Sequence, residues 1–114
     1  MKDCIFCRMV DRQAPAKIVY EDETALAIED IHPQAPTHLL VIPRQHVVSL
    51  EDLAPVEEPL AGHLLGVAAR LARARGLEKT GYRVVINNGA GAGQSVFHLH
   101  VHLLGGRPFR WPPG

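Results

Sequence analysis

Three histidines occupy alternate positions near the end of the chain, in the run H-L-H-V-H-L-L at residues 98–104. Alternate side chains of a β-strand point to the same face. The run therefore predicts a strand with His98, His100 and His102 in one row and apolar side chains on the opposite face. Three imidazoles in a row can bind a metal, because His-x-His on a strand is a common ligand pair. They can also supply a nucleophile and acid–base catalysts.

A glycine-rich loop, N-G-A-G-A-G-Q at residues 88–94, precedes these histidines and is followed by Ser95. Glycines allow the backbone to turn its N–H groups toward an anion. The loop is neither a dinucleotide fingerprint nor a P-loop, because its glycine spacing is wrong for the first and no Gly-Lys-Ser/Thr follows. Together the loop and the histidines offer a nucleophile, donors for phosphate oxygens and a hydroxyl beside a leaving group. This combination favours chemistry at a phosphate.

Two cysteines, Cys4 and Cys7, form a C-x-x-C near the beginning of the sequence. In a reducing compartment such a pair indicates a metal site or a redox pair more than a structural disulfide. A redox pair would lie between a strand and a helix of a βαβ unit, and this pattern does not surround these residues, so a metal site is the preferred interpretation. The alternative is that both cysteines line a ligand pocket as small apolar residues.

Hydrophobic periodicity predicts the elements that position these residues. Two amphipathic helices are expected, one at residues 4–10 with Asp3 as N-cap and one at residues 59–75. His63, on the longer helix, is interpreted as a surface or core residue without a functional role. The expected strands are residues 17–21 and 24–30, which form a hairpin, residues 38–43 in the middle of the sheet, and residues 82–87 and 98–104. The pattern predicts an α+β fold, a five-stranded, mainly antiparallel sheet with one main helix and a short N-terminal helix.

The composition limits the classes of function. The 114 residues are expected to form a single domain, residues 1–114. The formal net charge is zero and the sequence pI is about 7.1, which argues against nonspecific binding to nucleic acid, since that needs a clustered excess of Lys and Arg. No apolar segment is long enough to span a bilayer, and the N-terminal residues have no signal-peptide pattern. We therefore expect a cytoplasmic protein without nucleic-acid or membrane partners.

The run at residues 98–104 resembles the His-φ-His-φ-His-φ-φ signature of the histidine-triad (HIT) superfamily, in which φ is an apolar residue. Four further stretches resemble its Hint branch, the purine nucleoside phosphoramidases: D-I-H-P-Q-A-P-T-H at residues 30–38, V-I-P-R-Q-H at 41–46, G-Q-S-V at 93–96 and W-P-P-G at 111–114. The resemblance covers nearly the whole chain and implies a HIT-like fold. It also implies a homodimer in which each C-terminal tail reaches toward the other active site. Two positions depart from the pattern, since Cys7 stands where many members carry glycine and His32 replaces a small polar residue.

The resemblance implies roles for individual residues. His100 matches the nucleophile that forms a nucleotidyl-histidine intermediate, and the main-chain carbonyl of His98 would fix its tautomer. His102, Gln94 and Ser95 match groups on the phosphate oxygens and the leaving group. The implied catalytic residues are His98, His100, His102 and Ser95. The implied nucleotide-binding residues are Ile5, Phe6, Met9, Ile28, Asp30, Ile31, Asn87, Gly93, Gln94, Ser95, His100 and His102.

Within the nucleotide-binding set, Asp30 matches a carboxylate that accepts from the ribose hydroxyls, Asn87 lies beside the phosphate, and the apolar members form a slot for the purine. The implied activity is hydrolysis of purine nucleoside phosphoramidates, with a purine nucleoside monophosphate or its phosphoramidate as ligand. Two alternatives stay open: a dinucleoside polyphosphate hydrolase, and a nucleotide-binding regulatory module with incidental turnover.

The resemblance also implies a metal site. The residues that resemble the structural zinc set of bacterial members, and of the related galactose-1-phosphate uridylyltransferases, are Cys4, Cys7, His46 and His98.

Overall fold

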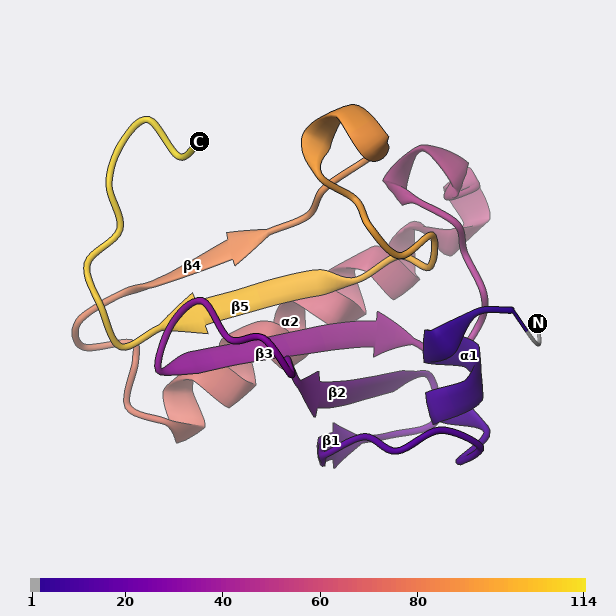
Figure 1. Ribbon diagram of the computed structural model, residues 1–114, viewed down its shortest axis with the longest axis horizontal. Coiled ribbons are helices and arrows are strands. Elements are labelled where there is room, and N and C mark those ends of the chain that lie inside the picture. The colour runs from indigo at the N-terminus through magenta and orange to yellow at the C-terminus, as the bar shows by residue number, and fades with distance from the viewer. Residues whose placement is uncertain (1–2) are drawn as a thin grey trace.

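The fold is built around a five-stranded antiparallel sheet. The structure is a computed structural model that describes residues 3–114. The strands are β1 (Ile18–Glu21), β2 (Ala25–Glu29), β3 (Thr37–Pro43), β4 (Tyr82–Val85) and β5 (Val101–Gly105). They lie in the order β1-β2-β3-β5-β4, and every neighbouring pair is antiparallel (Figure 1). The predicted fold class is confirmed.

Strand β3 lies in the centre of the sheet, as its continuous apolar sequence predicts, and all of its residues are buried. Its side chains alternate between two covered faces. Leu39 and Val41 join the hydrophobic clusters under the main helix, whereas Leu40 and Ile42 join the cluster on the other face. His38 shares this second face, and the register of β3 with β5 places Leu40 opposite His102.

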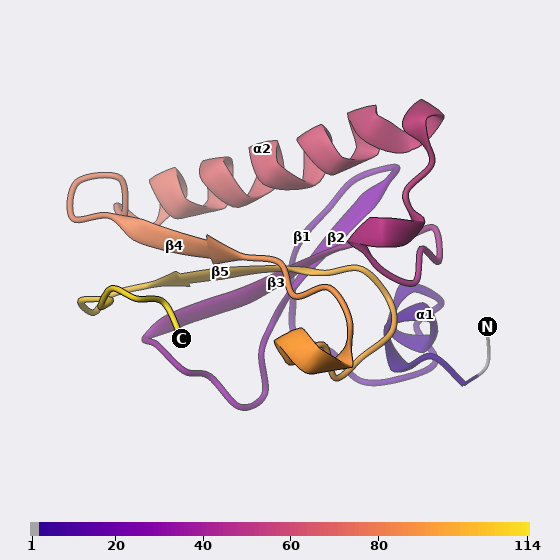
Figure 2. The ribbon, with the colours of Figure 1, turned by 90° about the horizontal axis from the view of Figure 1, so that it is seen from above.

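Two helices cover opposite faces of the sheet (Figure 2). The main helix α2 (Glu58–Ala74) packs against one face through its predicted apolar stripe, in which Leu64, Val67 and Ala68 are buried. The short helix α1 (Ile5–Val10) packs against one end of the other face, where Phe6 lies among apolar side chains of β2 and β3. Because α1 is short, it leaves the rest of this face open to a ligand. Within residues 3–114, no helix combines the length and the apolar character needed to cross a bilayer.

Two strand boundaries differ by more than one residue from those expected, and the cap of one helix differs. Strand β5 begins at Val101, so that His98 and His100 precede it. The pairing with β3 extends only to the pair Val41–Val101, and beyond this point the Leu99 N–H donates to the Val47 carbonyl outside the ladder. Strand β4 likewise ends two residues before the expected residue 87. The predicted N-cap was also wrong, because the first turn of α1 is capped by the Cys4 sulfur, which accepts from the Cys7 N–H.

The β1–β2 hairpin is tied to α2 by one carboxylate. Asp22 accepts from the N–H groups of Thr24 and Ala25 in the turn, from the Tyr20 hydroxyl, and from His63 on α2 at 2.7 Å. Burial raises the pKa of Asp22, but the hydrogen bonds from Tyr20, Thr24 and His63 outweigh burial and hold the pKa well below its ordinary value. His63 therefore has a structural role that periodicity did not predict.

Candidate active site

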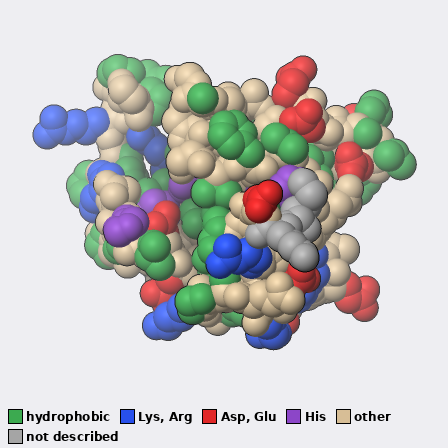
Figure 3. Space-filling view, turned by 45° about the vertical axis from the view of Figure 1, so that its right-hand side comes forward, with side chains coloured by type: hydrophobic (Ala, Val, Ile, Leu, Met, Phe, Trp, Pro, Cys, Tyr) green, Lys and Arg blue, Asp and Glu red, His purple; other side chains and the backbone are tan. Residues whose placement is uncertain are grey.

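A cavity of about 260 Å³ opens on the face of the sheet opposite α2. We call it the histidine cavity, because His100 and His102 lie in its wall. Hydrophobic, acidic and histidine side chains meet in a hollowed part of the surface (Figure 3). The predicted ligand-binding residues that line the cavity are Ile5, Phe6, Met9, Ile28, Asp30, Ile31, Ser95, His100 and His102. The structure thus gathers these residues from α1, β2, β5 and two loops into one site.

His100 has its tautomer fixed by the main chain. Its Nδ1 lies 2.7 Å from the His98 carbonyl oxygen, and a carbonyl can only accept, so Nδ1 carries the proton. Nε2 therefore holds a free lone pair, which is the form of imidazole that attacks an electrophile. The ring is 7% exposed and meets the edge of Phe6 at 5.1 Å between centroids. This geometry agrees with the tautomer that the resemblance implied.

In His102 the ring nitrogens have roles opposite to those in His100, because Nδ1 accepts a hydrogen bond and Nε2 carries the proton. The Gln34 N–H donates to His38 Nδ1 at 3.0 Å, so neutral His38 carries its proton on Nε2. This N–H lies 2.9 Å from His102 Nδ1 and 3.4 Å from Asp30 Oδ2. Since His102 Nδ1 accepts, His102 carries its proton on Nε2 and can donate it into the cavity.

Burial keeps the imidazole rings of His38 and His102 uncharged. Burial, with smaller contributions in the same direction from the imidazoles of His100 and His38, lowers the pKa of His102 to about 4. Burial also lowers the pKa of His38, with Asp30 acting in opposition. At neutral pH the site therefore contains one imidazole that presents a lone pair and another that presents an N–H, without a positive charge on His102 or His38.

His38 is a candidate functional residue to which sequence reasoning gave no site role. It was expected as the first residue of a central strand and as the end of the stretch at residues 30–38 that resembles the Hint branch, whereas the structure places it within hydrogen-bonding distance of the triad. A signal existed in the pattern of strands. If β3 and β5 are paired antiparallel, His38 and His102 lie on the same face in diagonally neighbouring positions.

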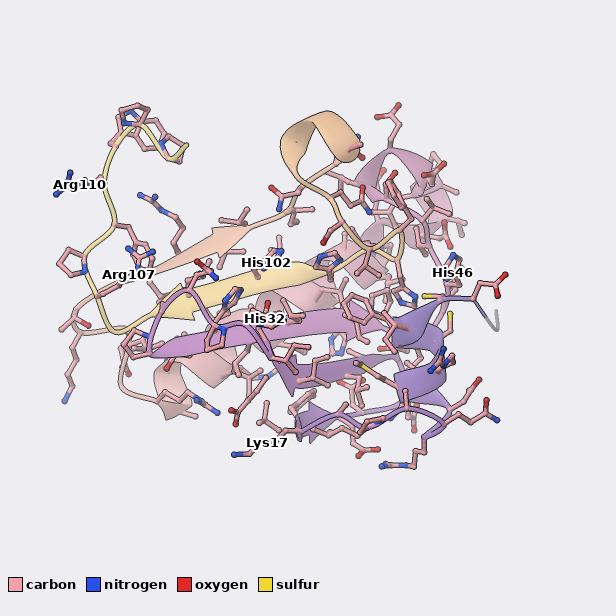
Figure 4. The ribbon with its side chains drawn as sticks, viewed as in Figure 1. Lys17, His32, His46, His102, Arg107 and Arg110 are labelled. Atoms are coloured by element: carbon pink, nitrogen blue, oxygen red, sulfur yellow. The ribbon has the colours of Figure 1, made fainter. Side chains whose placement is uncertain are left out.

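Asp30 and Ile31 form the outer wall of the cavity, next to the end of β2. Asp30 Oδ1 accepts from the His32 N–H at 2.8 Å, and the carboxylate retains lone pairs for hydroxyl groups of a ligand. Ile31 is 82% exposed, so it forms the rim of the cavity and not its floor. His32, at which the sequence departs from the Hint pattern, also lines this rim, and Figure 4 shows it near His102.

Gln94 has a side chain that is bonded to three backbone groups. Its side-chain oxygen accepts from the Gly89 N–H, and its side-chain nitrogen donates to the carbonyls of Val48 and Val96. The amide is buried, and these bonds join the glycine-rich loop to its neighbours. The predicted contact of Gln94 with phosphate remains a prediction. Across residues 3–114, neither Asn87 nor Gly93 lines the cavity. Their predicted positions beside a phosphate remain predictions.

The four residues of the predicted zinc set lie together where α1 meets the sheet. Cys4 Sγ is 3.3 Å from His98 Nδ1, and Cys7 Sγ is 3.1 Å from His46 Nδ1. One ligand atom from each of the four lies within 4.8 Å of the others. Two sulfurs and two imidazoles at this spacing fit a tetrahedral ion such as Zn²⁺. Figure 4 shows His46 beside α1, away from His102.

The hydrogen bonds of this cluster also fit a metal. His98 Nε2 donates to the Pro43 carbonyl at 2.8 Å, so the unprotonated Nδ1 faces the sulfurs, and a carbonyl partner of this kind is typical for a metal-bound histidine. Burial lowers the pKa of His98 to about 4 and raises that of Cys7 to about 11. In the part of the chain that the structure describes, neither cysteine lines the histidine cavity. Cys4 instead lines a neighbouring cavity together with Ile5, His46 and Ser95.

Three solved structures resemble this chain closely. A HIT family hydrolase from Legionella pneumophila is 47% identical with a TM-score of 0.96, covering 98% of this chain and 100% of its own. A zinc-bound histidine triad family protein from Mycobacterium smegmatis is 44% identical with a TM-score of 0.82, covering 93% and 76%. A histidine triad nucleotide-binding protein from Candida albicans is 29% identical with a TM-score of 0.83, covering 98% and 85%.

The sequence model of the HIT domain matches residues 11–109, which include the β1–β2 hairpin, α2 and the triad. This match spans most of the chain, and the structural likeness to the Legionella hydrolase extends over almost all of it. The five-stranded antiparallel sheet with its one long helix, and the three histidines with their fixed tautomers, agree with this assignment. The chain belongs to the HIT domain family.

Proposed function

We propose that the protein is a nucleotide-binding hydrolase that cleaves purine nucleoside phosphoramidates through a nucleotidyl intermediate on His100. One observation carries the proposal: in the histidine cavity, His100 offers an unprotonated Nε2, while His102 offers an Nε2–H. An apolar slot and the Asp30 carboxylate lie in the same cavity. A purine would fill the slot, and the ribose hydroxyls would donate to Asp30.

In the first step, His100 Nε2 attacks the α-phosphorus and the phosphorus–nitrogen bond breaks. The amine leaves with the electron pair of that bond and takes a proton from solvent, while the His102 N–H stabilises the charge on the phosphate oxygens or on the leaving nitrogen. In the second step, water attacks the phosphorus and the bond to His100 breaks, which releases a nucleoside monophosphate. Two easier displacements replace one difficult hydrolysis.

Neutral imidazole suits this reaction because the phosphate oxygens are anionic and repel an anionic nucleophile. With an ordinary pKa near 6.5, a histidine is available in its neutral form at neutral pH. The low pKa of His102, about 4, keeps that ring neutral. It therefore donates from Nε2 and carries no second proton on Nδ1, which accepts from His38. The Candida relative is called nucleotide-binding, which supports a nucleotide as ligand.

The experiment compares kcat/KM of the purified protein for adenosine 5′-phosphoramidate and for a diadenosine polyphosphate. The proposal expects faster turnover of the phosphoramidate, together with an acid-quenched adduct of the protein with AMP. Preferential cleavage of the polyphosphate would assign the protein to the dinucleoside polyphosphate hydrolases. Tight AMP binding with negligible turnover of both compounds would instead indicate a regulatory nucleotide-binding module.

We also propose that the cluster of Cys4, Cys7, His46 and His98 binds a structural Zn²⁺. The support is the donor set, its spacing and the free Nδ1 of His98, together with the zinc-bound relative. A closed set of four protein ligands leaves no position for a reactive water. The ion would therefore hold α1 against the sheet, and the reaction would remain with the residues of the histidine cavity.

Finally, we propose that the protein is a homodimer. Trp111 is 82% exposed in the single chain. Strand β4 forms one edge of the sheet, and its Tyr82 and Val84 are each 37% exposed. Exposed aromatic and apolar side chains on an open edge are typical of a surface covered by a partner.

A further inference from the structure

The segment that follows β5 turns back onto the β2–β3 loop (residues 30–36), which forms part of the wall of the histidine cavity. Gly106 has a φ of +93°, and a Cβ placed on it would lie 2.9 Å from Pro36 Cβ. Only glycine allows this backbone conformation and this close approach together. The next residue, Arg107, donates from Nε to the Gln34 carbonyl at 2.9 Å.

Arg107 is held in this position by contacts of its own. Its guanidinium also donates to the Pro108 carbonyl at 2.9 Å and lies 4.3 Å from the centroid of the Phe109 ring, a distance typical of a cation–π interaction. Figure 4 shows Arg107 at the outer end of β5, beside the loop that carries His32. Arg107 is exposed, and these contacts to its own segment restrict the orientation of its guanidinium at Gln34.

Gln34 connects this arginine to the active site. Its carbonyl accepts from Arg107, while its N–H donates to His38 Nδ1. That N–H favours the His38 tautomer with its proton on Nε2, as does the Asp30 carboxylate 3.4 Å from this nitrogen. The same Nε2 lies 2.9 Å from His102 Nδ1. Within the loop, the Gln34 side chain donates to the His32 carbonyl, and the His32 N–H donates to Asp30 Oδ1.

We propose that Arg107 is a positioning residue that acts on His102 through Gln34 and His38. By holding the carbonyl of the Gln34–Ala35 peptide, it restrains the backbone of Gln34. The N–H of the preceding Pro33–Gln34 peptide then stays directed at His38 Nδ1, and the proton of His102 stays on Nε2, facing the cavity. Without it, the loop can move away from His38, and His38 and His102 can exchange between tautomers. The catalytic consequence rests on the proposed hydrolase function, whereas the effect on the tautomers does not.

The test variant is Arg107→Met, which keeps an apolar stem against Phe109 and removes every N–H donor. The matched control is Arg83→Met. Arg83 lies 5.2 Å from the same Phe109 ring and donates to the Arg110 carbonyl of the same segment, but its described hydrogen bond does not reach Gln34. Circular dichroism establishes folding, and Arg107→Ala provides a second variant if the methionine variant does not fold.

The decisive readout is the pattern of histidine ring correlations between ¹⁵N and ¹H, recorded without substrate. In wild type and in Arg83→Met, His38 and His102 should each show one tautomer, with the proton on Nε2. In Arg107→Met both rings should show averaged ¹⁵N shifts. In phosphoramidate turnover, kcat should fall by about tenfold, a part of what a positioned proton donor contributes.

Two results would overturn the proposal. The first is an unchanged tautomer pattern in Arg107→Met, whatever the activity. The second is an equal disturbance of His38 and His102 in Arg83→Met, which would indicate a general loosening of the C-terminal segment. If the wild type cleaves no phosphoramidate, the proposed function fails, but the tautomer pattern still decides the role of Arg107.

Discussion

The imidazoles of the site are chemically identical, and each receives its role from the main-chain group that it contacts. His98 donates to the Pro43 carbonyl and turns Nδ1 toward the sulfurs. His100 donates to the His98 carbonyl and turns Nε2 toward the cavity. His38 accepts from the Gln34 N–H, which makes it a donor to His102. A carbonyl or an N–H beside the ring thus separates the proposed metal ligand, the proposed nucleophile and the proposed hydrogen-bond donor.

Replacing the nucleophile gives the first prediction. In His100→Ala, turnover of adenosine 5′-phosphoramidate should fall below about a thousandth of the wild-type rate, because no other group replaces the covalent step. Binding of AMP, measured by calorimetry, should change little, since the slot and Asp30 remain. His63→Ala is the control, because His63 contacts Asp22 on the other side of the molecule. A His100→Ala variant that retains a tenth of the activity would show that the proposed mechanism is wrong.

At the scale of elements, the sequence predicted most of the fold because periodicity is a local property. The alternation at residues 98–104 identified the face of each side chain, and Leu99, Val101 and Leu103 are buried as expected. It could not locate the start of β5, because that boundary depends on where the neighbouring β3 stops pairing.

Local sequence patterns could not predict contacts between elements that are distant in the sequence. The bond between Asp22 and His63 joins a turn to a helix 41 residues later, and that between His38 and His102 joins positions 64 residues apart. The zinc set could be assembled only through resemblance, because its cysteines and histidines are 39 or more residues apart in sequence. The bonds of the Gln94 side chain to three backbone groups were likewise not indicated by its sequence neighbours.

The second prediction concerns the junction of α1 with the sheet. Protein purified without chelator or metal-affinity resin should contain roughly one zinc per chain, and a Cys4→Ser, Cys7→Ser variant should contain none. Because the ion would join α1 to His98 and His46, the variant should also unfold at a lower temperature. Its activity should fall indirectly, since the His98 carbonyl positions His100. Equal, near-zero metal in both proteins would contradict the proposed site.

At the scale of the whole molecule, buried neutral histidines make stability depend on pH. Burial lowers the pKa of His102 to about 4, and that of His98 to about 4 when no metal is bound, below the ordinary value of 6.5. As pH falls through this interval, the unfolded chain binds protons that the folded chain does not, so the free energy of unfolding decreases.

The third prediction follows from this difference. The midpoint of thermal unfolding should fall steadily between about pH 7 and about pH 4, and His102 alone should account for a loss on the order of 3 kcal/mol. Above about pH 7 both rings are neutral in both states, and they should contribute no slope. In His102→Asn, the midpoint of thermal unfolding should change less with pH between about pH 7 and about pH 4. A midpoint that is constant down to about pH 4.5 would contradict the low pKa values.

The last prediction concerns assembly. The tail (residues 106–114) ends in W-P-P-G, with Trp111 82% exposed, and it follows β5, the neighbour of the open edge strand β4. A second copy related by a two-fold axis could cover this edge and receive the tail, since a self-complementary surface is the commonest way to close an oligomer.

Deleting residues 110–114 should then weaken the dimer and change the relative rates for different leaving groups. The deletion leaves Arg107 and its bond to Gln34 in place, so the two effects can be separated. Light scattering of the intact protein at micromolar concentration provides the measurement, and a monomer under these conditions would count decisively against the dimer.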